Sequence, residues 1–367
     1  PTRRRRCHST PATLWVAMLP FLISPSSPTE ESEALRICGP GCRTVTTPHY
    51  RIASAAPEER IAACTQTLEA VYGEVFAFLP ELGLQPADDR SPLPVVLFTE
   101  HNRFAAVAEA AGLPRDVGGF YDVRADLAVL LDAASIPAIQ EVDARIREFA
   151  TGAEIDAADG GTASELTNPA ARAQIVNWRA RRDAIVEQHD RLVLRHEAAH
   201  QLFYRFGVHQ RSAANPVWLV EGLACQFETS AGPGAVGPPS TNPYRLSDLE
   251  RSAVRRRPPQ PSDVRSNRPE EQAATWIPLR KLLGQTDLPA ASTPDRAALF
   301  AESWALVYYL RAQHGVRFAE YLRETASRGP AATDAGAGRE PARFEAFFGP
   351  AGADFEERLI AFITPDR

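Results

Sequence analysis

The chain has 367 residues, 44% of them hydrophobic, so it is long enough to bury a sizeable core. Its length favours two or three lobes, or one domain with insertions. The formal net charge of -6, without a pattern of basic and aromatic residues, argues against a nucleic-acid-binding surface.

The N-terminus has the pattern of an export signal. Residues 3–6 are arginines, and an apolar stretch covers residues 14–23. This stretch has the length of a signal-peptide core and is short for a membrane span. We therefore expect residues 1–30 to be a signal peptide or an uncleaved N-terminal anchor, which would be the protein's only contact with a membrane. A leader without a targeting role is the remaining alternative. The export signal predicts a protein that is secreted, periplasmic or in the cell envelope.

The cysteines fit an oxidising compartment. Cys7 would leave with a signal peptide, and an even number would remain, at Cys38, Cys42, Cys64 and Cys225. The first two of these flank a Gly-Pro-Gly run and could close a small disulfide loop. Four free thiols are the alternative.

An α/β lobe is predicted over residues 45–135, after a linker at residues 31–44. Alternating and apolar runs predict its strands, and periodic runs flanked by Pro57, Pro80 and Gly112 predict its helices. The expected strands lie at residues 49–54, 95–98, 118–122 and 127–131, and the helices at residues 57–79 and 101–111.

The rest of the chain is predicted to be mainly helical. Polar helical sequence over residues 136–189 indicates a surface insertion. Residues 190–206 form a strongly amphipathic helix before Gly207, and another helix follows Pro216, so that residues 190–230 hold two helices. A mostly helical C-terminal lobe is expected over residues 231–367, with helices near residues 300–314, 317–327, 343–348 and 355–363.

The run HEAAH, from His196 to His200, is the strongest motif in the chain. Histidines four residues apart lie on one face of a helix, so both imidazoles can reach one ion. Glu197 points about a quarter turn away and can reach a water at the ion without binding the ion. A catalytic zinc needs three protein ligands and a fourth position for water. Two surface histidines on a packed helix are the alternative.

A third ligand is predicted from the following sequence. A metzincin would have glycine and histidine at the positions of Phe203 and Phe206, so that pattern fails. Instead, 20 residues separate His200 from Glu221, enough for a helix end and an antiparallel return helix. Glu221 has apolar neighbours, among which an uncompensated charge would be costly. A metal ion would compensate it.

HEAAH followed by WLVEGLA resembles the gluzincins, the clan of thermolysin and the zinc aminopeptidases, which share HExxH and a glutamate on a second helix. A more complete resemblance, over most of residues 45–365, is to a secreted bacterial family of unknown function with runs like HEAAHQLFY, WLVEGLA and HYRIAS. The Gly-Ala-Met-Glu-Asn run of the aminopeptidases is missing from this sequence, so exopeptidase specificity is not implied.

The resemblance implies an α+β metallopeptidase fold, with a small mixed sheet in the N-terminal lobe, a helical C-terminal lobe and the zinc helix between them. It makes His196, His200 and Glu221 the ligands of one Zn2+ per chain and Glu197 the catalytic base. Residues 190–230 are then the zinc-binding helices. The implied reaction is hydrolysis of a peptide or protein substrate by activated water.

Cys225 and Glu228 both follow Glu221 in the sequence and lie near the same helix face. Glu228 could orient a ligand histidine, or it could be solvated. Cys225 is more typical of a small buried hydrophobic residue than of a ligand. Four further histidines have no partner spacing, and we interpret them as structural or exposed: His49, His101, His189 and His209.

Peptide hydrolysis develops an oxyanion in its transition state, and the sequence does not assign the group that would stabilise it. Gluzincins commonly use a downstream tyrosine or histidine. The resembling family would place a tyrosine where this chain has Phe300. The candidates are Tyr244, Tyr308, Tyr309 and His314, and the two adjacent tyrosines also suit a helix core. The strand at residues 127–131 is a candidate for the sheet edge that pairs with an extended substrate, or an ordinary core strand.

Two alternative functions stay open. One is a catalytically degenerate, secreted binding module with a gluzincin fold, although such a module would not need Glu197 as a base. The other is a helical protein with a fortuitous HExxH motif, which metal analysis would distinguish.

Overall fold

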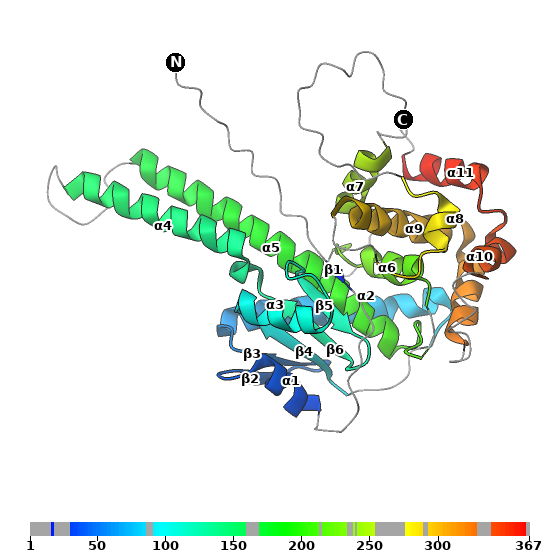
Figure 1. Ribbon diagram of the computed structural model, residues 1–367, viewed down its shortest axis with the longest axis horizontal. Helices are drawn as coiled ribbons and strands as arrows, with labels where there is room; N and C mark the ends of the chain where they lie inside the picture. Colours follow the sequence, from blue (N-terminus) through cyan, green and yellow to red (C-terminus); the bar gives the residue numbers. More distant parts are fainter. Residues whose placement is uncertain are drawn as a thin grey trace, which may run out of the picture.

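The computed structural model describes residues 16–17, 30–85, 91–158, 169–212, 215–232, 238, 241–253, 276–288, 293–328 and 339–364. It has an α+β fold, in agreement with the fold class predicted from the sequence. A small mixed sheet lies in the N-terminal part and helices make up the C-terminal part, with the long helix α5 (Pro169–Arg205) between them (Figure 1).

The sheet has the strand order β1-β5-β6-β4-β3-β2. Pairing is parallel for β1 with β5, β3 with β4 and β4 with β6, and antiparallel for β2 with β3 and β5 with β6. The strands are β1 (Val16–Ala17), β2 (Arg43–Thr46), β3 (Tyr50–Ser54), β4 (Leu93–Phe98), β5 (Gly119–Asp122) and β6 (Leu127–Leu131).

Most predicted helices of the first 230 residues lie within a few residues of their expected bounds. In this part the structure has α1 (Glu30–Cys38), α2 (Glu58–Phe78), the 3-10 turn η1 (Leu79–Leu82), α3 (His101–Ala110), the 3-10 turn η2 (Ala133–Ser135), α4 (Pro137–Ala158), α5 and α6 (Val217–Gln226). The C-terminal part has α7 (Pro243–Ala253), α8 (Leu279–Leu283), α9 (Thr293–Ala326), α10 (Glu340–Phe348) and α11 (Ala353–Ile363). Neither α7 nor α8 was predicted from the sequence. α9 bends at His314, where the backbone is not helical (φ −134°, ψ 28°), in agreement with the two helical runs expected there.

Helices cover both faces of the sheet. Side chains alternate along a strand, so neighbouring residues of β4 enter different cores. Val95 and Leu97 pack with α2 and α5, and Val96 and Phe98 pack with α1 and α3. β4 is buried along its whole length, as expected for a strand covered on both faces. The sheet therefore gives α5 a rigid platform.

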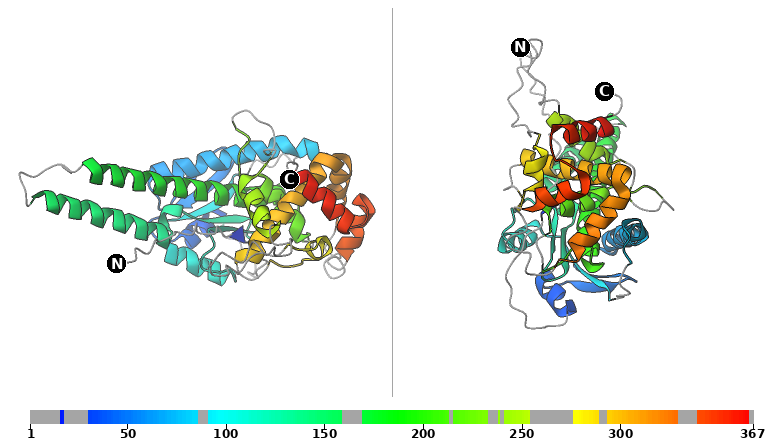
Figure 2. Two further views of the ribbon diagram at one scale, coloured as in Figure 1. Left: turned by 90° about the horizontal axis from the view of Figure 1, so that it is seen from above. Right: turned by 90° about the vertical axis from the view of Figure 1, so that its right-hand side faces the viewer.

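The helix that carries HEAAH is longer than predicted. The sequence analysis separates an insertion at residues 136–189 from a metal helix that begins at residue 190, but α5 crosses this boundary without a break. Since neither glycine nor proline occurs between Ala170 and Arg205, nothing interrupts it. The first half of α5 pairs with α4 in a helical arm that projects from the body (Figure 2).

The predicted linker at residues 31–44 is also structured. It holds most of α1 and the first residues of β2, and a disulfide joins Cys38 to Cys42 across the turn between them. Cys64 and Cys225 are free and buried. Of the apolar stretch at residues 14–23, only β1 belongs to the part that the structure describes. Within that part, no helix combines the length and apolar character needed to cross a bilayer.

Candidate metal centre

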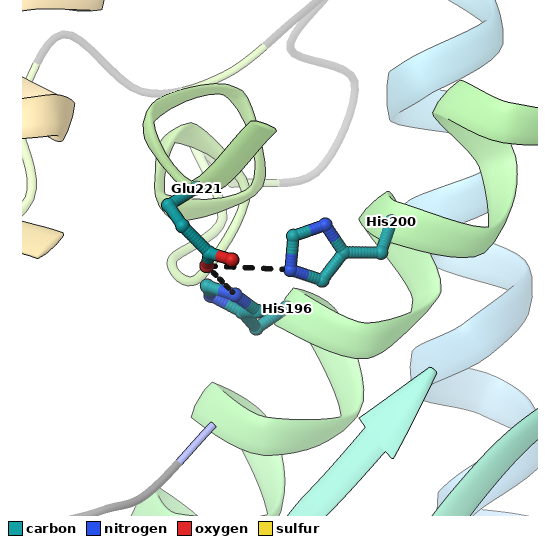
Figure 3. Close-up of side chains that lie close together, drawn as sticks. All are labelled: His196, His200 and Glu221. Atoms are coloured by element: carbon teal, nitrogen blue, oxygen red, sulfur yellow. Dashed lines mark hydrogen bonds and ion pairs between the residues drawn. The ribbon is translucent and has the colours of Figure 1, made fainter. Parts of the chain in front are cut away.

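Two helices bring the three predicted ligands together. His196 and His200 are one turn apart on α5, with ring centroids 4.6 Å apart, and Glu221 projects toward them from α6 (Figure 3). Oε2 of Glu221 lies 3.3 Å from Nε2 of His196 and 3.5 Å from Nε2 of His200. All three side chains are at most 2% exposed. Their arrangement could hold a metal ion.

The ligand separations fit zinc. Bonds of about 2.0–2.1 Å at a tetrahedral angle place two ligand atoms roughly 3.3–3.4 Å apart. The distances from Glu221 to the two imidazoles match this spacing and are long for hydrogen bonds. Neither ring nitrogen of His200 has a hydrogen-bond partner among the described residues. The Nε2 atom of His200 is therefore available to bind a metal ion.

The electrostatics also suit a cation. Burial alone would raise the pKa of Glu221, but the imidazoles of His200 and His196 lower it to about 2. Burial lowers the pKa of His200 and favours the neutral ring that binds metals. Burial has the same effect on His196, but Cys225, Glu221 and Glu228 outweigh it and raise its pKa, so a metal bound there would displace a proton.

Glu197 is the predicted base, and its carboxylate interacts electrostatically with His196 and Glu221. Its carboxylate is fully buried, and neither oxygen has a hydrogen-bond partner among the described residues. Burial raises its pKa to about 8, although the charge of His196 and the backbone amide of Tyr121 on β5 act in the opposite direction. In its ionised form, such a carboxylate is a stronger base than an exposed one and can accept a proton from a water molecule.

Glu228 lies beyond the end of α6, yet its Oε1 is 2.9 Å from Nδ1 of His196. This contact agrees with the orienting role considered for it, and its 1% exposure excludes the solvated alternative. Burial alone would raise the pKa of Glu228, but Arg245 and His196 lower it to about 2. The anionic oxygen can therefore accept the proton of Nδ1 and leave Nε2 available for a metal.

Cys225 completes a second cluster, with His196 and Glu228. We do not interpret this cluster as a metal site, because Arg245 donates to both oxygens of Glu228 and its positive charge would repel a cation. Burial raises the pKa of the Cys225 thiol to about 11, so it stays protonated and is a poor ligand. Its complete burial agrees with the hydrophobic role expected from the sequence.

The strand beside the site is β5, so of the two alternatives for residues 127–131 the substrate-pairing edge is wrong and the core strand is confirmed. β6 pairs with β4 on one side and β5 on the other and is an ordinary core strand. β5 approaches α5 closely, since a Cβ added to Gly119 would lie 2.8 Å from Val193. The outer edge of β5 is bordered by β1, in parallel register with Gly119 and Phe120.

Most of the candidates for the group that stabilises the oxyanion are packed between helices. Tyr308 stacks on Trp304, and Tyr309 contacts aromatic rings of α11, in agreement with their predicted core role. His314 lies against Tyr309, and Tyr244 is 37% exposed on α7. Phe300, at the position where a tyrosine was expected, has its ring centroid 5.7 Å from that of His196.

Sequence reasoning missed three side chains that interact electrostatically with Glu221, namely Tyr204, His209 and Arg296. His209 is 1% exposed between the rings of Phe203 and Tyr204, so it is structural as expected, but close to the site. Arg296 is 4% exposed and lies one turn before Phe300 on α9. No local motif distinguishes these residues in the sequence.

Comparison with known proteins adds one similarity. No curated protein matches the sequence closely enough to identify a relative. Residues 192–332 match a family model described as "Protein of unknown function (DUF1570)". This stretch contains the HEAAH motif, Glu221, Glu228 and Arg245, so the chain is similar to that family over its whole candidate metal centre.

Proposed function

We propose that the protein is a zinc-dependent peptidase of the gluzincin type. His196, His200 and Glu221 would hold one Zn2+, and Glu197 would accept a proton from the attacking water. The observation that carries this proposal is the spacing of Glu221 from both imidazoles, which suits a tetrahedral site, beside the buried carboxylate of Glu197, which has no hydrogen-bond partner among the described residues. Bound zinc would supply the Lewis acidity that lowers the pKa of water and polarises the scissile carbonyl.

The proposed substrate is an extended peptide. β5 borders the site, and the amide of its Tyr121 interacts with Glu197, so a peptide added along the outer edge of β5 would pass the base. Glu197 and the three ligands are at most 2% exposed. A peptide therefore reaches them only if a covering segment moves, and β1 would be displaced from Gly119 and Phe120.

The proposed location is secreted, periplasmic or in the cell envelope. The disulfide between Cys38 and Cys42 supports it, because such bonds persist mainly in oxidising compartments. The basic and apolar N-terminal pattern supports it independently.

The test is a mixture of synthetic peptides incubated with purified protein, with cleavage read by mass spectrometry. We expect cleavage that a zinc chelator abolishes and added Zn2+ restores, and none with Glu197→Gln. Tight zinc binding without cleavage of any peptide would contradict the enzyme and favour the binding module. Cleavage that survives complete removal of metal would contradict the zinc chemistry.

A further inference from the structure

The carboxylate of Glu228 contacts His196 and is also held by Asn242 and Arg245, which are not among the proposed metal ligands. Nε of Arg245 donates to Oε2 at 2.8 Å, and Nη2 of the same guanidinium donates to Oε1. Nδ2 of Asn242 donates to Oε2 at 2.7 Å. With Nδ1 of His196 on Oε1, four donors surround the carboxylate, which is about the number it can accept. Glu228 therefore has one fixed orientation.

Asn242 is itself fixed from two sides. Its Oδ1 accepts from the backbone amides of Tyr244 and Arg245, at 3.1 and 3.3 Å, and so caps the first turn of α7. Its Nδ2 also donates to the carbonyl of Cys225 at 3.0 Å, in the last turn of α6. The start of α7 is thereby attached to the helix that carries Glu221.

Arg245 is packed as well as paired. Its guanidinium lies over the ring of Phe300, 5.1 Å from the centroid, and the same ring lies beside His196. A planar guanidinium with two parallel bonds to a carboxylate restricts rotation more than a point charge does. The ring of Phe300 on α9 thus packs against both Arg245 and His196. The resembling family would have a tyrosine at this position.

The two ligand histidines are supported differently. Nδ1 of His196 is anchored on Glu228, whereas Nδ1 of His200 has no partner among the described residues. The orientation of His196 therefore depends on residues that are 14 and 17 positions beyond Glu228 in the chain.

We propose that Asn242 and Arg245 are positioning residues of the metal centre, which hold Glu228 so that it directs Nε2 of His196 toward the metal. This inference rests on the proposed zinc site. It makes the first turn of α7 a part of that site, although α7 supplies no ligand.

The experiment measures zinc affinity by chelator competition in the full-length protein and in Arg245→Met, Arg245→Lys and Asn242→Ser. Arg182→Met is the matched control, because Arg182 makes the same two-pronged contact with Asp143, at 2.9 and 2.7 Å, on the arm. It lies four helical turns, roughly 21 Å, before His196. We expect unchanged affinity for this control and about 10–100-fold weaker binding for Arg245→Met.

The two milder variants keep the test decisive if Arg245→Met does not fold. Lysine keeps the charge without the planar pair of donors, and serine keeps a helix cap without the donor to Glu228. Each should weaken zinc binding by a smaller factor than Arg245→Met. The visible spectrum of the Co2+-loaded protein should also change, since it reports ligand geometry, and it should stay unchanged in Arg182→Met.

A double-mutant cycle identifies the route of the effect. If Arg245 acts through Glu228, then Arg245→Met should add little to the loss of affinity caused by Glu228→Gln. Fully additive losses would contradict the proposal, as would wild-type affinity and spectrum in Arg245→Lys and Asn242→Ser. Wild-type protein that binds no zinc would instead overturn the proposed function itself.

Discussion

Gly222 and Ser303 bring the backbones of α6 and α9 into contact. A Cβ added to Gly222 would lie 2.5 Å from the carbonyl oxygen of Ser303 and 2.6 Å from Cγ2 of Val307. Since a backbone carbonyl cannot rotate away as a flexible side chain can, only glycine fits here. The position next to Glu221 is therefore fixed by the packing of the two helices.

Gly222→Ala should move α6 away from α9. We expect it to lower the free energy of unfolding by about 1–3 kcal/mol, as overpacking does, and to weaken zinc binding through Glu221. The control is Gly73→Ala in the middle of α2, where an added Cβ meets nothing within 4 Å. That change should be neutral or stabilise the protein by up to ~1 kcal/mol. If Gly222→Ala and Gly73→Ala are equally stable in urea denaturation, the packing argument is contradicted.

Glu197→Gln and Glu221→Gln should separate base from ligand. The first should keep zinc, because Glu197 is not a ligand, and reduce hydrolysis by roughly 10²–10⁴-fold, because an amide cannot accept the proton. The second should weaken zinc binding as well as hydrolysis, because a neutral oxygen is a poorer ligand. Zinc content and cleavage rate are measured on the same preparations, with circular dichroism as the folding control. Loss of zinc from Glu197→Gln with retention in Glu221→Gln would reverse the assignment.

His209 should make the fold sensitive to acid. Burial lowers its pKa from 6.5 to about 3, aided by the charge of His200. The contribution of neutral His209 to the free energy of unfolding is complete above pH 6.5. At lower pH, the imidazole binds a proton in the unfolded chain but not in the folded chain. This group alone should then lower stability by about 1.4 kcal/mol per pH unit until the pH nears 3. His209→Phe should flatten this slope in urea denaturation between about pH 7 and pH 5. An unchanged slope would show that another group is responsible.

The grouping of His196, His200 and Glu221 could be predicted because its information is local. The spacing of His196 and His200 fixes one helix face, and the apolar neighbours of Glu221 indicate a buried carboxylate whose charge must be compensated. The strands of the α/β lobe were predicted for the same reason, since alternation and turn residues are read within a few positions.

The missed features depend on contacts between distant segments. Nothing near Arg245 in the sequence indicates that it binds Glu228, and no pattern in β5 or β6 shows which of them lies beside α5. The boundary at residue 190 was misplaced because the polar first half of α5 and its buried second half differ in composition. Their backbone is nevertheless one helix, since composition reports what surrounds a helix and not where it ends.

Zinc quantification tests the central claim most directly. Elemental analysis of freshly purified wild-type protein should give one zinc per chain, and His196→Ala, prepared in parallel and shown to be folded, should give much less. The Arg182→Met variant should match the wild type. Wild-type protein without stoichiometric metal, or His196→Ala with a full complement of zinc, would contradict the metal centre proposed here.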